Sequence, residues 1–100
     1  LDKKHAELRD IMDKPFSDAC ERNRDLILQV LKEDFAHVRN VLEIGSGTGQ
    51  HAVYMAEHLP HLIWRTSELP ENHEGIRAWV EDSGLANVCL PITLDVRATD

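Results

Sequence analysis

The spacing of apolar residues predicts two helices at the start of the chain. Residues 1–14 carry a narrow apolar stripe on a charged segment, and the proline that follows ends this helix. Ser17 or Asp18 can cap a second helix running to about Phe35, with Glu21 placed three residues after Asp18 as in a capping box. One face of this helix is expected to point to the core through four apolar side chains, Ile27, Val30, Leu31 and Phe35.

Three short apolar runs alternate with two helical segments in the rest of the chain. The expected elements are, in order, a strand at 41–44, a helix at 48–58, a strand at 62–68, a helix at 72–83 and a strand at 88–96. Pro91 has no amide hydrogen to donate, so the third strand is expected at a sheet edge. Strands that alternate with helices predict an α/β fold with a doubly wound parallel sheet and right-handed crossovers.

Composition limits the classes of function. One hundred residues suit a single domain, and a net charge of −7 argues against duplex nucleic acid as the main partner. Cys20 and Cys89 form no disulfide framework, and the six histidines show no metal-binding spacing. No apolar run approaches the roughly 20 residues of a membrane span, so a cytoplasmic protein is expected. Because the chain lacks an initial Met and stops after a strand-like run, it is expected to be part of a longer protein.

The candidate chemistry centres on Glu43, Gly45, Gly47 and Gly49, which follow the first strand and precede a helix. Glycines allow a tight turn and a close ligand approach, and amides at a helix start attract negatively polarised groups. This pattern predicts a site for a nucleoside-type cofactor. The dinucleotide fingerprint G-x-G-x-x-G would need a third glycine at position 50, which holds Gln50. The alternative is a glycine-rich turn that only connects a strand to a helix.

Two further acids end the second and third strands. Glu68 stands about 20 residues beyond the glycines, where such folds bind ribose hydroxyls, although it could also be a solvated helix-capping acid. Leu69 could pack on an adenine face or belong to the core. Asp95 could also face the ligand or form a turn. Carboxyl ends of parallel strands meet at one edge of a sheet, so the three acids Glu43, Glu68 and Asp95 are expected to share a site.

The spacing Glu43-x-Gly45-x-Gly47-x-Gly49 resembles the first motif of class I S-adenosylmethionine-dependent methyltransferases. Residues 14–96 also resemble the amino-terminal half of the methyltransferase-like protein 26 family and its bacterial relatives. The matching stretches are Lys14-Pro15-Phe16-Ser17, residues 19–24, residues 41–51, Leu59-Pro60, Trp64 with Ser67, residues 76–79, Asn87-Val88 and Leu94-Asp95-Val96. Thr66-Ser67-Glu68 departs from the Pro-Ser-Asp that is usual there, which keeps the carboxylate but adds one methylene.

The resemblance implies a Rossmann-like, seven-stranded sheet of order 3-2-1-4-5-7-6. Residues 1–100 would then be the amino-terminal, cofactor-binding half of one methyltransferase domain, with its first three strands in the order 3-2-1. The implied cofactor is S-adenosylmethionine, with a small-molecule methyl acceptor. The candidate binding residues are Glu43, Gly45, Ser46, Gly47, Gly49, Glu68, Leu69, Asp95, Arg22 and Asn23. No metal site is expected, and catalytic residues are expected after Asp100.

Several alternatives stay open at this stage. Arg22 could pair with the methionine carboxylate and Asn23 could bond to it or to a substrate, or both could lie on a solvated helix surface. His51 is the one histidine near the predicted site and could take part in binding, but a histidine at a helix start is more often a surface residue. The domain could be a catalytically silent interaction module or bind a nicotinamide dinucleotide. An apolar, unpaired edge at residues 41–44 would favour an oligomer.

Overall fold

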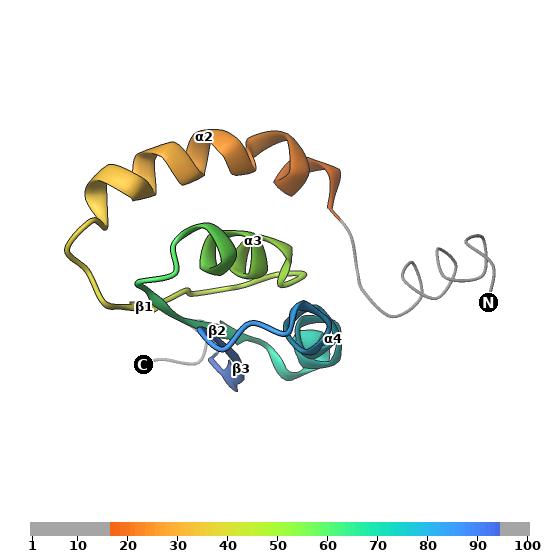
Figure 1. Cartoon of the computed structure of the whole chain (residues 1–100). Helices are drawn as coiled ribbons and strands as arrows, with labels where there is room; N and C mark the ends of the chain where they lie inside the picture. Colours follow the sequence, from red (N-terminus) through yellow and green to blue (C-terminus); the bar gives the residue numbers. More distant parts are fainter. Residues whose placement is uncertain (1–16, 95–100) are drawn as a thin grey trace, which may run out of the picture.

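A computed structural model describes residues 17–94, which form a three-stranded parallel sheet flanked by helices (Figure 1). The arrangement is compatible with a Rossmann-like fold. Asp95 and the helix predicted at residues 1–14 lie outside the described residues. The elements are α2 (Asp18–Asp34), β1 (Asn40–Leu42), α3 (Gln50–His58), β2 (Ile63–Glu68), the 3-10 turn η1 (Pro70–Asn72), α4 (His73–Ser83) and β3 (Val88–Thr93).

The sheet has β2 in the middle, with β1 and β3 parallel to it on either side. The strand order is β1-β2-β3, which gives the same neighbours as the order 3-2-1 written from the opposite edge. Trp64 of β2 lies beside Val41 of β1 and Val88 of β3. Pro91 lies in an edge strand as predicted, and the register between β2 and β3 shifts beside it, between the pairs Arg65–Cys89 and Ser67–Ile92.

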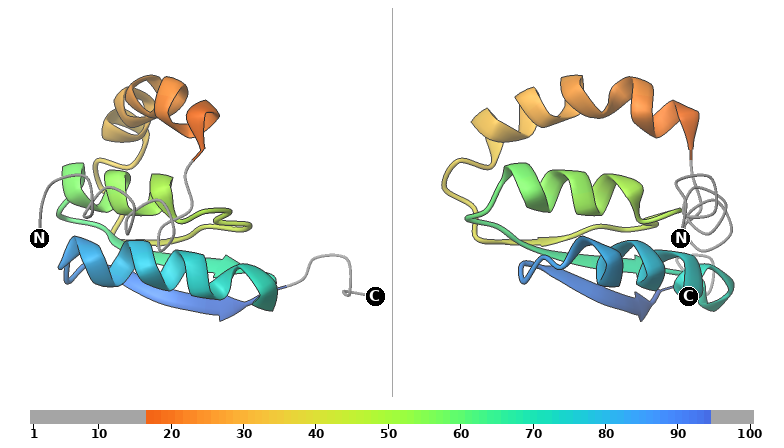
Figure 2. Two further views of the ribbon diagram at one scale, coloured as in Figure 1. Left: turned by 90° about the vertical axis from the view of Figure 1, so that its right-hand side faces the viewer. Right: turned by 45° about the vertical axis from the view of Figure 1, so that its right-hand side comes forward.

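Helices α3 and α4 cover one face of the sheet, and α2 lies outside α3 as a further layer (Figures 1 and 2). Each new strand is added on the same side of the one before it, so right-handed crossovers place both connecting helices on one face of the sheet. Within residues 17–94, the sheet therefore lacks the helices on its second face that a doubly wound fold has. The core lies between the sheet and these helices. Its most buried apolar side chains are Ala52, Met55, Ala56, Leu62 and Ile76.

The start and the buried face of α2 differ from the sequence prediction. Ser17 is the N-cap, and its hydroxyl accepts the Cys20 N–H at 3.3 Å, whereas Asp18 is the first helical residue. Ile27 and Val30 were expected to face the core, but they are 37% and 56% exposed. Leu28 is buried instead, and Leu31 and Phe35 pack beside it as expected. The helix is therefore rotated so that the row of residues 21, 24, 28, 31 and 35 faces α3.

Most other boundaries shift by one or two residues, whereas β3, predicted to run to residue 96, ends at Thr93, before Leu94. Strand β1 ends at Leu42, but the ladder continues for one more hydrogen bond, from the Glu43 N–H to the Arg65 carbonyl at 2.9 Å. Helix α3 begins at Gln50 because the preceding residues form the turn, where the Thr48 hydroxyl accepts the Gln50 N–H at 3.1 Å. Helix α4 ends at Ser83, and Gly84 follows it as the predicted stop. Its left-handed φ of 67° is typical of a glycine after the last turn of a helix.

The outer edge of β1 has no neighbouring strand within residues 17–94. Leu42 and Ile44, at and just after the end of β1, are 48% and 56% exposed. An apolar unpaired edge invites association, so the predicted oligomer through this edge stays a prediction. Among the described helices, none combines the length and the apolar character needed to cross a membrane.

Candidate functional site

The glycine turn, residues 45–49, connects β1 to α3 and has left-handed backbone at each of its three glycines. The φ angles of Gly45, Gly47 and Gly49 are 73°, 60° and 89°. A Cβ placed on Gly45 or Gly47 would have no atom within 4 Å, whereas a Cβ on Gly49 would lie 3.0 Å from the Ile76 Cα of α4. Gly49 therefore allows α3 and α4 to pack closely, while the other two glycines leave open space above the turn.

Ser46 and Ser67 fasten the glycine turn to the end of β2. The Ser46 N–H donates to the Ser67 carbonyl at 2.8 Å, and the Ser67 N–H donates to the Ser46 hydroxyl oxygen at 3.0 Å. The Ser67 hydroxyl in turn donates to the Glu43 carbonyl at 2.5 Å. Both serines are buried. The predicted site residue Ser46 thus uses its backbone and its hydroxyl to hold the shape of the turn.

Glu68, the acid at the end of β2, lies against the glycine turn. One carboxylate oxygen accepts the Gly47 N–H at 3.0 Å, and the other accepts the N–H of Leu69 at 2.8 Å. The Leu69 hydrogen bond is the main reason that the pKa of the Glu68 carboxyl is lowered, while partial burial acts in the opposite direction. Hydrogen bonds from Gly47 and Asn72 and the charge of His73 lower this pKa further. At neutral pH, Glu68 is therefore a carboxylate that only accepts hydrogen bonds.

The remaining predicted residues are placed differently. Glu43 is half-buried, two residues before the turn, and its carboxylate accepts the Trp64 indole N–H at 3.2 Å. Leu69 is half-buried next to Glu68. Arg22 and Asn23 lie on α2 with exposed side chains. The structure therefore brings Glu68 and Gly47 together, whereas the Glu43 carboxylate contacts Trp64 and the side chains of Arg22 and Asn23 are exposed on α2.

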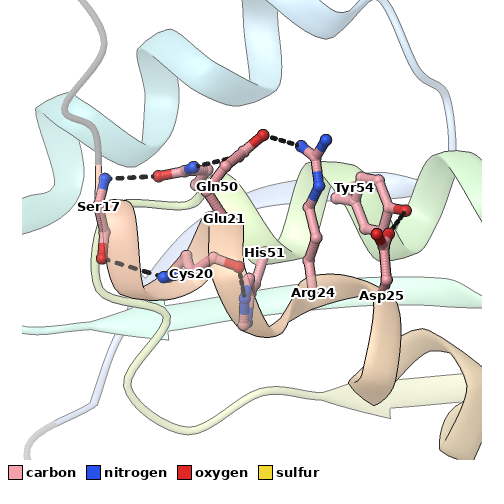
Figure 3. A network of polar contacts seen from close by, with 8 residues as sticks. All are labelled: Ser17, Cys20, Glu21, Arg24, Asp25, Gln50, His51 and Tyr54. Atoms are coloured by element: carbon pink, nitrogen blue, oxygen red, sulfur yellow. Dashed lines mark hydrogen bonds and ion pairs between the residues drawn. The ribbon is translucent and has the colours of Figure 1, made fainter.

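A polar network connects the start of α2 to the start of α3 (Figure 3). The Gln50 side chain accepts the Ser17 N–H at 2.7 Å and donates to the Glu21 carboxylate at 2.9 Å. The His51 Nε2 donates to the Cys20 carbonyl at 3.0 Å. Further along, the Tyr54 hydroxyl donates to Asp25 at 2.5 Å, and Arg24 pairs with Glu21 at 2.7 Å and lies over the Tyr54 ring. We call these eight residues the α2–α3 network: Ser17, Cys20, Glu21, Arg24, Asp25, Gln50, His51 and Tyr54.

Comparison with known protein families places this chain in one of them. A family model described as "Protein of unknown function (DUF938)" matches residues 14–100. The chain belongs to the DUF938 family. That description assigns neither an activity nor a cofactor to the family. No solved structure matches the chain.

The role of Gln50 in this DUF938 chain was missed by sequence reasoning. In the sequence, Gln50 was considered only because it replaces the third glycine of the dinucleotide fingerprint. In the structure it is 5% exposed and has hydrogen bonds to two residues at the start of α2, Ser17 and Glu21. Glu21 was assigned to a capping box within α2, but its carboxylate faces Gln50 instead. No local sequence pattern connects the two positions, because Gln50 lies 29 residues after Glu21.

Within residues 17–94, no group of three or more His, Cys, Asp or Glu side chains could bind a metal ion. The polar groups at the glycine turn are instead the Glu68 carboxylate and the backbone amides that donate to it, and the carboxylate can also accept hydrogen bonds from hydroxyl or ammonium groups of an organic ligand.

The lowered pKa of Glu68 predicts a pH-dependent contribution to stability. The folded-state pKa lies below the ordinary value of 4.5, so the carboxylate stabilises the fold above about pH 4.5 and this contribution is lost as the pH falls through the lowered pKa. We expect wild type to exceed Glu68→Gln in free energy of unfolding at pH 7, with the difference vanishing in stronger acid. Urea unfolding of both proteins between pH 7 and pH 3 measures this. A difference that is constant over that range would contradict it.

Proposed function

We propose that this chain is the cofactor-binding part of an S-adenosylmethionine-dependent methyltransferase. The observation that carries the proposal is the Glu68 carboxylate, which hydrogen-bonds to the Gly47 amide of the glycine turn at 3.0 Å. A carboxylate at the end of the second strand, beside a glycine turn after the first, is the arrangement that binds a nucleoside ribose in such folds. The Glu-x-Gly-x-Gly-x-Gly spacing favours S-adenosylmethionine among the nucleoside cofactors.

The acceptor positions of Glu68 fit ribose hydroxyl groups. An ionised carboxylate has about four lone-pair positions, and the Gly47 and Leu69 amides occupy two of them. Asn72, a further hydrogen-bond partner, is exposed and can yield its place to a ligand hydroxyl. The space above Gly45 and Gly47, where a Cβ would meet no protein atom, allows a ligand to approach the backbone.

The charge of Glu43, two residues before the turn, suits the amino acid end of the ligand. Its carboxylate can attract the ammonium group. S-adenosylmethionine supplies a methyl group on a positive sulfonium, which an acceptor removes by in-line displacement. The described residues would contribute binding and alignment, which account for much of the acceleration in such reactions.

Gln50 supports S-adenosylmethionine over a nicotinamide dinucleotide. In the dinucleotide fingerprint, the third glycine allows the helix to pack closely on the strand beside the pyrophosphate. Here the equivalent position carries a buried side chain bonded to α2. The α2 start therefore lies beside the α3 N-terminus, where a pyrophosphate would need room and free amides.

Calorimetric titration of the protein with S-adenosylmethionine, S-adenosylhomocysteine and NAD tests the proposal. We expect both sulfur nucleosides to bind and NAD to bind more weakly or not at all. The variant Gly47→Asn should lower S-adenosylmethionine affinity at least about tenfold, because Asn tolerates left-handed backbone but fills the open space. Gly84→Asn is the matched control, since Gly84 has a similar φ of 67° and open surroundings away from the turn.

Three outcomes would contradict the proposal in different ways. Tighter binding of NAD would overturn the cofactor assignment. Binding of none of the three ligands would favour a catalytically silent interaction domain. Equal affinity losses in the Gly47 and Gly84 variants would show that the glycine turn is not the binding site.

A further inference from the structure

The side-chain amide of Gln50 joins two segments that are far apart in the sequence. Its oxygen accepts the Ser17 N–H at 2.7 Å, and its nitrogen donates to the Glu21 carboxylate at 2.9 Å (Figure 3). The residue is 5% exposed, and no buried side-chain N or O atom within residues 17–94 lacks a hydrogen-bond partner. Both ends of the amide are therefore satisfied by α2, and withdrawal of α2 would leave them without these partners.

Gln50 takes a role that usually belongs to a residue of the capped helix itself. In a capping box, a Glu or Gln in the first turn accepts the N–H of the N-cap residue. Ser17 is the N-cap of α2, but its N–H donates to Gln50 of α3. The capping-box position for Ser17 is occupied by Cys20, which has no acceptor side chain of that kind. The next residue, Glu21, accepts from the same Gln50 side chain. The position at which α2 begins is thus specified by a residue next to the glycine turn.

The two halves of α2 are held by different forces. The later half is packed by apolar side chains, with Leu28 buried and Leu31 and Phe35 beside the core. The first turn is held by the hydrogen bonds of Gln50 and by His51, which donates to the Cys20 carbonyl. Water can replace such hydrogen bonds at a small net cost, whereas apolar packing has no comparable substitute. The first turn can therefore open while the rest of α2 stays in place.

This first turn lies at the edge of the sheet where the glycine turn and Glu68 lie. In Figure 2, the amino-terminal end of α2 is at the same end of the molecule as the carboxyl ends of the strands. Gln50 directly follows Gly49, so its hydrogen bonds to Ser17 and Glu21 place the α2 start beside the turn.

We infer that Gln50 is a positioning residue that holds the first turn of α2 closed beside the glycine turn, so that the closed position and ligand binding favour each other. The identity of the ligand rests on the proposed function; the closure itself does not. Because coupling between two equilibria is reciprocal, loss of the Gln50 contact lowers the affinity for the ligand, and bound ligand makes opening of the first turn of α2 less frequent.

Exchanging the two partners tests the contact. Gln50→Glu keeps an acceptor for Ser17 but faces Glu21 with a second carboxylate, so the pair should repel. We expect hydrogen–deuterium exchange of amides 20–24 to become at least about tenfold faster, and S-adenosylmethionine affinity to fall about five- to tenfold. The double variant Glu21→Gln/Gln50→Glu restores one donor and one acceptor with the roles reversed. Both quantities should return to within about threefold of wild type.

Tyr54→Phe is the matched control because it removes a hydrogen bond to Asp25 between the same two helices, farther from the turn. Affinity should stay unchanged in this variant. Amides of α4 and the sheet should exchange as in wild type throughout, which separates closure from global unfolding. Faster exchange in Gln50→Glu with unchanged affinity would overturn the inference, as would an equal affinity loss in Tyr54→Phe or no recovery in the double variant.

The inference and the proposed function fail separately. If wild type binds no S-adenosylmethionine, the proposed function fails. Hydrogen–deuterium exchange of amides 20–24 then still tests whether Gln50 holds the first turn closed. An unchanged rate in Gln50→Glu would overturn the closure, and a faster rate that returns to the wild-type value in the double variant would support it.

Discussion

Replacing Glu68 with Gln is expected to weaken S-adenosylmethionine binding by about 100-fold. The side chain keeps its length, but one acceptor oxygen becomes an NH2 group that points a donor at the Gly47 or Leu69 amide. Hydrogen bonds to a charged group contribute about 1.5–3 kcal/mol each, so loss of one or two to the ribose hydroxyls corresponds to roughly 10-fold to 20,000-fold in affinity. The lower part of this range applies because Glu68 is only half-buried.

Glu68→Asp is the matched control for this substitution. It keeps the charge and shortens the side chain by one methylene, so affinity should fall by less than about tenfold. A 2′-deoxyribose analogue of S-adenosylhomocysteine sharpens the comparison. Wild type should bind it much more weakly than the parent compound, whereas Glu68→Gln should discriminate little. Calorimetry of the three proteins with both ligands measures this, and equal discrimination by wild type and Glu68→Gln would rule out a ribose contact.

Much of the fold was predictable because its signals are local. The spacing of Ile76 and Val80 predicted the buried face of α4, and Gly84 predicted where that helix ends, since left-handed backbone at its stop favours glycine. Pro91 predicted an edge strand because a proline has no N–H to donate to a neighbouring strand. Each of these signals depends on one residue or one helix face and needs no knowledge of the partner.

The orientation of α2 could not be predicted because several of its faces carry apolar residues. Ile27 and Val30 were as good candidates for the core as Leu28 when the helix was considered alone. The observed rotation packs Leu28 into the core. It also satisfies polar partners on α3, where Gln50 meets Glu21 and Tyr54 meets Asp25. Those contacts join positions 29 residues apart, so no local pattern contains them.

The candidate site was predicted in outline for a related reason. The glycine turn and Glu68 both follow strands, and parallel strands bring their carboxyl ends together whatever the details of packing. The hydrogen bonds that shape the turn were less predictable. Ser46 pairs with Ser67 and Glu43 with Trp64 through the register of β1 against β2, which the sequence does not specify.

Gly49→Ala is expected to lower the free energy of unfolding by about 2–5 kcal/mol. A non-glycine residue in left-handed backbone costs about 1–2 kcal/mol, and Gly49 has a φ of 89°. A methyl group there would also lie 3.0 Å from the Ile76 Cα, in the backbone of α4. Ile76 is fully buried, so α4 cannot move away without disturbing the core, and such overpacking costs about 1–3 kcal/mol.

Gly84→Ala separates the two contributions to this loss. Gly84 has a similar left-handed φ of 67°, but a Cβ there would meet no atom within 4 Å, so only the backbone cost of about 1 kcal/mol applies. Urea unfolding of wild type and both variants gives the comparison. A larger loss for Gly49→Ala assigns the excess to the contact between α3 and α4. Equal losses would mean that α4 shifts freely to accept the methyl group, and close packing would then not be the reason for glycine at position 49.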